Sequence, residues 1–92
     1  MAHIPAEELI RRLEEAKEQV VIGGKYTHYR HPGRLYTVIN IALDEATQEP
    51  VVIYQSPFDT VLIWVRPLPD WLGNVTDETG TVVPRFQKAD AV

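Results

Sequence analysis

The spacing of apolar residues changes abruptly at Gly23-Gly24, and this change limits the folds open to the chain. Before the glycines, apolar residues recur every three or four positions between Leu9 and Val20, which is the period of an amphipathic helix. After the glycines the period is two, which is the spacing of a β-strand. The sequence therefore predicts one helix over residues 5–20 and a β-rich region after it.

The start of this helix carries the expected signals. Pro5 suits the first helical position, and Glu7 and Glu8 favour the positive end of the helix dipole. A helix of this length is only marginally stable alone. We therefore expect its apolar stripe to pack on the strands.

Four strands and a weaker fifth are predicted after the glycines. Their sequences are KYTHYR (25–30), LYTVINIAL (35–43), VVIYQ (51–55), VLIWV (61–65) and TVVPRF (81–86). The short connections between them favour antiparallel hairpins, since parallel strands need a long crossover. We predict a mainly β (α+β) fold, a small SH3-like antiparallel β-barrel or curled sheet of about five strands. Residues 1–22 form the N-terminal helix and residues 23–92 the small β-barrel domain.

Both faces of the predicted strands are apolar. In residues 35–43, alternation places Ile39 and Ile41 on one face and Tyr36 and Val38 on the other. A sheet with one face in water alternates apolar and polar residues more cleanly. We therefore expect the second face to be covered, either by the N-terminal helix or by a second subunit.

Composition excludes several classes of protein. The chain has no cysteine, which removes disulfides, thiolate catalysis and thiolate zinc sites. Its net charge of −4 argues against general binding to nucleic acid. No segment approaches the roughly 20 apolar residues of a membrane span, and the charged N-terminus does not resemble a signal peptide. We expect a soluble, cytoplasmic protein.

Four short blocks, GKYTHY, VVIYQ, WVRPL and VPRF, follow one another between about Gly24 and Phe86. In content and order they resemble the bacterial domain of unknown function 1653. The matching positions are Tyr26, His28, Tyr29, Tyr36, Tyr54, Gln55, Trp64, Arg66, Pro67, Pro84 and Arg85. The loops depart from the family pattern, as in LDEATQEP before the third strand. The resemblance implies a compact β-rich fold and no activity, because the family has none assigned.

Trp64 and Arg66 are two residues apart in a predicted strand, so their side chains share one face. Pro67 lacks an N–H and ends the ladder pairing of that strand. Arg66 can hold a carboxylate or phosphate, or stack on an aromatic ring. It can equally brace the PLPDWL turn that follows, and both interpretations stay open.

The candidate ligand-binding face combines aromatic and cationic side chains. Its members are Tyr26, His28, Tyr36, Tyr54, Trp64, Arg66 and Arg85. Such a face suits a small anionic ligand, a nucleotide or a peptide. The sequence thus indicates a small non-catalytic binding module. The alternative is a structural protein that forms a homodimer through the helix and the second apolar sheet face.

Catalytic and metal-binding roles find little support. His28 and Tyr29 have no identifiable acid or nucleophile as a partner, so we predict no catalytic residue. His28 and His31 fall in a predicted strand and a predicted turn, and we expect His3 to be either a tag remnant or a plain surface residue. We predict neither a metal site nor a cofactor.

Overall fold

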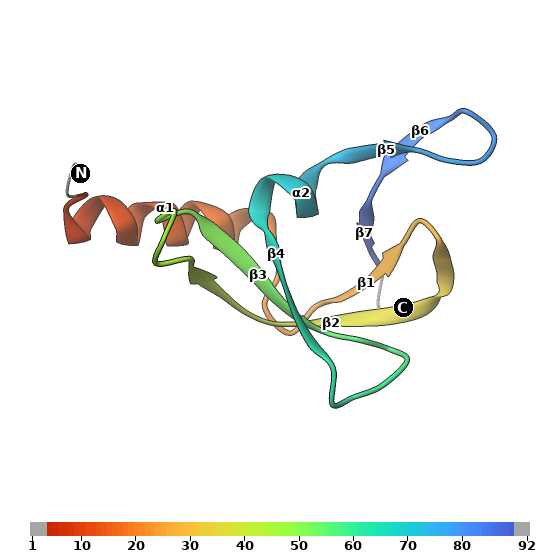
Figure 1. Ribbon diagram of the computed structural model, residues 1–92, viewed down its shortest axis with the longest axis horizontal. Coiled ribbons are helices and arrows are strands. Elements are labelled where there is room, and N and C mark those ends of the chain that lie inside the picture. Colours follow the sequence, from red (N-terminus) through yellow and green to blue (C-terminus); the bar gives the residue numbers. More distant parts are fainter. Residues whose placement is uncertain (1–3, 90–92) are drawn as a thin grey trace.

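The computed structural model describes residues 4–89. One long helix precedes a five-stranded antiparallel sheet with the strand order β4-β3-β2-β1-β7 (Figure 1). These elements are α1 (Ala6–Gln19), β1 (Lys25–His28), β2 (His31–Leu43), β3 (Pro50–Gln55), β4 (Ile63–Pro67) and β7 (Phe86–Lys88). A short helix, α2 (Leu68–Leu72), follows β4, and β5 (Asn74–Thr76) pairs with β6 (Val82–Pro84) in a separate hairpin.

The main sheet is open, with β4 and β7 at its two edges. The predicted mainly β fold, with a five-stranded antiparallel sheet and an N-terminal helix, is confirmed, but the closed SH3-like barrel is not. The reason lies in the predicted strand 81–86, which is two strands in the structure. Val82–Pro84 pairs with β5, and only Phe86–Lys88 reaches β1. Three residues at that edge do not extend to β4, so the sheet does not close.

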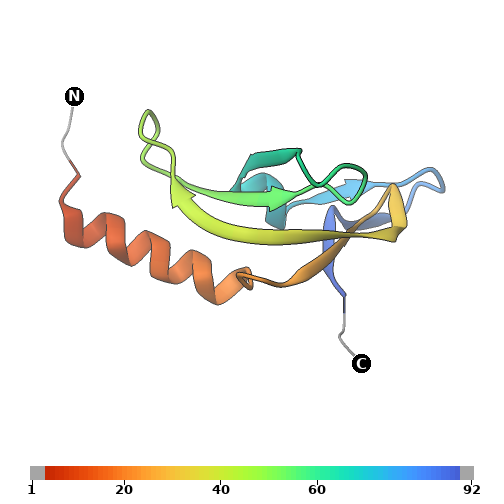
Figure 2. The same cartoon turned by 90° about the horizontal axis from the view of Figure 1, so that it is seen from below.

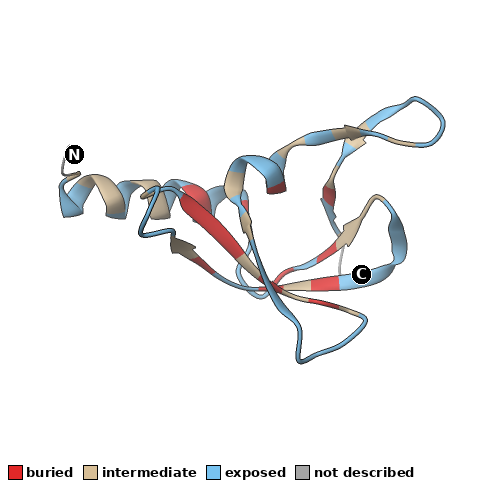
Figure 3. Cartoon of the chain, viewed as in Figure 1, coloured by how far each residue is buried: buried red, intermediate tan, exposed pale blue. Residues whose placement is uncertain are grey.

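The hydrophobic core lies on one face of the sheet. It contains Ala16, Val20, Tyr26, Tyr36, Val38, Ile41, Val52, Tyr54, Trp71 and Phe86. Ala16 of α1 and Trp71 of α2 both belong to this core, so both helices pack on this face of the sheet. Figure 2 shows β2 bending along its length, with α1 beneath its C-terminal half. In Figure 3 buried residues follow β1, β2 and β3, whereas β4 and the β5–β6 hairpin are exposed or intermediate.

A β-bulge in β2 decides which residues reach this core. Val38 pairs with Tyr54, but the next pair joins Asn40 to Ile53, so β2 holds one extra residue. The bulge reverses the alternation of side chains after that point. Ile41 is therefore 4% exposed in the core, whereas Ile39 is 43% exposed. The expectation that these two isoleucines share a face is wrong.

The opposite face of the sheet carries exposed apolar side chains. Ile39, Ile63 and Val65 each expose between 43% and 60% of their surface. Because both helices pack on the core face, the expectation that α1 covers this second face is wrong. Within residues 4–89 no helix lies on it, and the alternative cover, a second subunit, stays a prediction.

Alanine substitution of Ile39, which lies in the bulge, and of Ile41, which follows it, tests the reversed alternation. We expect Ile41→Ala to lower the free energy of unfolding by about 2–5 kcal/mol, because it leaves a cavity in the core. Ile39→Ala, the matched control, should cost about 1 kcal/mol or less. Urea denaturation of the monomeric chain measures both values. Equal losses at the two positions would show that β2 alternates without a bulge.

Candidate functional site

A tight turn gathers four side chains at one end of the core face. His28 ends β1 and lies opposite His31, which begins β2, so only Tyr29 and Arg30 form the turn. The backbone N–H of Arg30 donates to Nδ1 of His28 at 3.2 Å. The sequence predicted this turn at residues 31–33, which instead lie in β2, where regular pairing with β1 is interrupted.

Arg66 reaches the same place from the edge strand β4. It pairs with Val52, so its side chain lies on the core face. The guanidinium carbon is 5.7 Å from the centre of the Phe86 ring, a cation–π contact. Its Nε atom is buried and has no hydrogen-bond partner among residues 4–89. Leaving a buried donor unpaired costs free energy, so the position of Arg66 is unfavourable for folding.

Arg85 occupies the link between β6 and β7 and is held at three points. Its Nε donates to the carbonyl of Asp70 at 3.1 Å, and its backbone N–H donates to that of Gly73 at 2.9 Å. Its own carbonyl accepts from the backbone N–H of Tyr29 at 3.1 Å. Arg85 therefore braces both α2 and the β1–β2 turn.

These elements enclose a hollow of about 380 Å³, here called the cationic pocket. It is lined by His28, Tyr29, Arg30, His31, Tyr36, Tyr54, Arg66, Arg85 and Phe86. The lining holds arginines and histidines but no carboxylate. Within residues 4–89, Arg30, Arg66 and Arg85 form no ion pair. The pocket is therefore a region of uncompensated positive charge.

Burial shifts the pKa values of two side chains of the pocket, His28 and Tyr36, in directions that favour their neutral forms, and each neutral form can donate a hydrogen bond. Burial, followed by the nearby charges of His31 and the three arginines, lowers the pKa of His28 from 6.5 to about 4. His28 is thus neutral at pH 7, and because its Nδ1 accepts a hydrogen bond, its proton lies on Nε2. Burial and the neighbouring Tyr54 raise the pKa of Tyr36, which keeps that phenol protonated.

Five of the seven predicted site residues line the cationic pocket. They are His28, Tyr36, Tyr54, Arg66 and Arg85. Tyr26 does not line it, since this ring is buried in the core and its hydroxyl accepts from the Val21 N–H at 2.9 Å. Trp64 faces the same side as Arg66, as its spacing predicted, but it is half exposed and does not line the pocket.

The sequence analysis did not include Tyr29, Arg30 and His31 in the site. Their signal is the run His-Tyr-Arg-His at residues 28–31, which concentrates rings and cations in four positions. The prediction of a strand over residues 25–30 obscured this signal, because strict alternation in a strand turns neighbouring side chains to opposite faces. The tight turn instead lets all of them reach one hollow.

Residues 4–89 contain no cluster of three histidine, aspartate or glutamate side chains that could hold a metal ion. Over the same range, neither helix has the length and apolar character needed to cross a bilayer. His3 lies outside the described residues.

Comparison with known proteins identifies the family but assigns no activity. A family model described as protein of unknown function (DUF1653) matches residues 24–88, so the chain belongs to this family. It is also similar to a crystal structure of a DUF1653 protein from Bordetella bronchiseptica. The two share 28% sequence identity with a TM-score of 0.65, over 80% of this chain and 94% of the other. No curated protein matches the chain.

Titration of His28 tests the electrostatics of the pocket. We expect the pKa of His28, measured by NMR titration, to be about 4. In Arg66→Gln this pKa should rise, because one neighbouring positive charge is removed. Arg34→Gln, an exposed arginine outside the pocket lining, should leave it unchanged. Because the unfolded state takes up the proton first, stability should fall as the pH drops from 6.5 towards 4. A pKa of His28 near 6.5 in the unmodified protein would contradict this account.

Proposed function

We propose that this protein is a non-catalytic binding module that holds a small anion in the cationic pocket. The observation that carries the proposal is that Arg30, Arg66 and Arg85 line one pocket, with no carboxylate partner among residues 4–89. Hydrogen bonds from guanidinium groups to carboxylate or phosphate oxygens are among the strongest in proteins. An anion here also offers acceptors to the guanidinium group of Arg66, which lines the pocket and forms no ion pair within residues 4–89.

Close aromatic packing at the floor of the pocket also supports this proposal. Phe86 packs edge-on against Tyr36 and Tyr54, with 5.7 Å between ring centres in both pairs. The arginines lie around this aromatic floor, and the neutral His28 and protonated Tyr36 add further donors. A site that is ordered in advance loses less entropy when it binds.

The number of cationic groups favours phosphate over carboxylate. A carboxylate carries one charge and two oxygens, which one guanidinium group can satisfy. A phosphate monoester carries up to two charges and three free oxygens, so several arginines can contact it together. The bound anion also attracts a proton to His28, so binding should raise the depressed pKa of this residue.

Calorimetric titration with inorganic phosphate tests the proposed function. We expect measurable binding that weakens by about tenfold or more in Arg66→Ala, which removes a charge-assisted contact. Arg34→Ala is the matched control and should keep the affinity. Should Arg66→Ala not fold, the exposed Arg30 provides a second variant, Arg30→Ala, with the same expected loss. Absence of phosphate binding, or equal affinity in all variants, would refute the proposal.

A second candidate function is homodimer formation through the uncovered side of the sheet. Five consecutive apolar residues, Val61 to Val65, are 44–81% exposed at and just before the free edge strand β4. Exposed apolar edge strands readily pair with a strand of another chain. Pairing of β4 with β4 of a second copy would satisfy this edge and bring the exposed apolar side chains of the two edge strands into cross-strand contact.

Sedimentation analysis at micromolar concentrations tests the dimer. We expect a concentration-dependent dimer that Val65→Lys converts to monomer, because a lysine on an edge strand opposes pairing with another chain and like charges meet across the strand pair. Val82→Lys, at a similarly exposed valine on β6, should leave the dimer intact. A strict monomer across the concentration range excludes this second function and leaves the anion site unaffected.

A further inference from the structure

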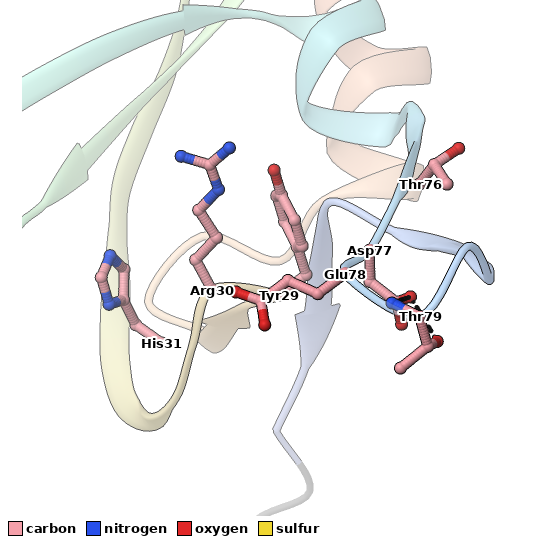
Figure 4. Close-up of a pocket in the computed structure, with 7 residues that line it drawn as sticks. All are labelled: Tyr29, Arg30, His31, Thr76, Asp77, Glu78 and Thr79. Carbon is pink, nitrogen blue, oxygen red and sulfur yellow. Dashed lines mark hydrogen bonds between the residues drawn. The ribbon is translucent and has the colours of Figure 1, made fainter.

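A second, larger hollow of about 710 Å³ adjoins the cationic pocket. Figure 4 shows the residues that line it: Tyr29, Arg30, His31, Thr76, Asp77, Glu78 and Thr79. The first three also line the cationic pocket. The two hollows therefore meet at the β1–β2 turn, and the larger one extends from there to the β5–β6 turn.

The chemistry of the lining changes along this path. The β5–β6 turn presents carboxylates, whereas the cationic pocket presents guanidinium groups. Oδ1 of Asp77 accepts hydrogen bonds from the N–H and hydroxyl of Thr79 and from the N–H of Thr81. These bonds lower the pKa of Asp77, the Thr79 hydroxyl contributing most, and they fix the shape of the turn. Glu78 is exposed, and in the view of Figure 4 it extends from this turn towards the β1–β2 turn.

A ligand that spans both hollows must therefore carry two kinds of group. Its anionic group belongs in the cationic pocket, and its remainder must offer hydrogen-bond donors to Glu78 and Asp77. A second phosphate at the β5–β6 turn would be repelled by these carboxylates, which disfavours polyphosphates and nucleic acid strands. Hydroxyl groups suit the position, because a carboxylate can accept hydrogen bonds from the hydroxyls of a ribose.

We propose that the ligand is the phosphate monoester of a polyhydroxylated compound, in the class of sugar phosphates and nucleoside monophosphates. The proposal rests on the proposed anion-binding function and extends it. The phosphate lies among Arg30, Arg66 and Arg85, and the sugar hydroxyls lie between the two turns, where Glu78 accepts their hydrogen bonds. Arg30 lines both hollows and contacts the ligand at the junction of phosphate and sugar.

Calorimetric comparison of inorganic phosphate, ribose 5-phosphate and ribose tests this inference. We expect ribose 5-phosphate to bind on the order of tenfold more tightly than inorganic phosphate, since it adds hydrogen bonds to a charged acceptor. Ribose alone should show no measurable binding, because it lacks the phosphate.

The variant Glu78→Gln distinguishes a direct contact between Glu78 and the sugar hydroxyls from a general electrostatic effect of Glu78 on anion affinity. Removing a negative charge favours any anion, so inorganic phosphate should bind equally or slightly more tightly. Ribose 5-phosphate should bind several-fold more weakly, a change of the opposite sign. Glu45→Gln, at an exposed glutamate in the distant β2–β3 turn, is the matched control and should change neither affinity.

The outcomes distinguish this inference from the function on which it rests. Equal affinities for inorganic phosphate and ribose 5-phosphate would overturn the sugar contact and leave the anion site standing. Loss of both affinities in Glu78→Gln would also overturn it. Failure of the unmodified protein to bind either phosphate compound would remove both proposals.

Discussion

The stacking of Trp71 on Phe86 is the contact on which the rest of the structure depends. The two rings lie nearly parallel, with centres 3.8 Å apart, and the indole also packs against Tyr26 and Tyr54 at 5.3 and 5.0 Å. One side chain of α2 thus joins β1, β3 and β7, which are far apart in sequence. Aromatic side chains bury large areas, so this cluster covers the core face where α1 does not reach. It also fixes Arg85, the residue before Phe86, at the edge of the cationic pocket.

The same packing places positive charges close together without neutralising them. Arg85 is held by backbone carbonyl groups, and Arg66 lies over the Phe86 ring with its Nε unpaired in the described part of the chain. Repulsion between these groups works against folding, and below about pH 6.5 the low pKa of His28 does so as well. Departures from favourable packing and pairing concentrate at functional sites. An anion in the pocket would relieve the charge repulsion and raise the pKa of His28 together, which is why we regard the pocket as a binding site.

The sequence predicts this fold well where the evidence is the local spacing of apolar residues. It predicts the fold poorly where the structure depends on one inserted residue or on contacts between distant segments. The change of period at Gly23-Gly24 located the helix and the start of the strands, and the spacing of Trp64 and Arg66 gave their common face correctly. Alternation could not reveal the bulge in β2, because one extra residue leaves the apolar composition unchanged. The proximity of Arg66 and Arg85 arises from pairing at opposite edges of the sheet and from the fold of α2, which no local pattern records.

The central claim is that the cationic pocket holds an anion, and crystals of the protein grown with tungstate test it most directly. Tungstate has the shape and charge of a phosphate dianion, and its anomalous scattering locates it without ambiguity. We predict a tungstate ion in contact with the guanidinium groups of Arg66 and Arg85, beside His28. Tungstate bound elsewhere, with only water in the pocket or with these arginines paired to carboxylates, would contradict the account.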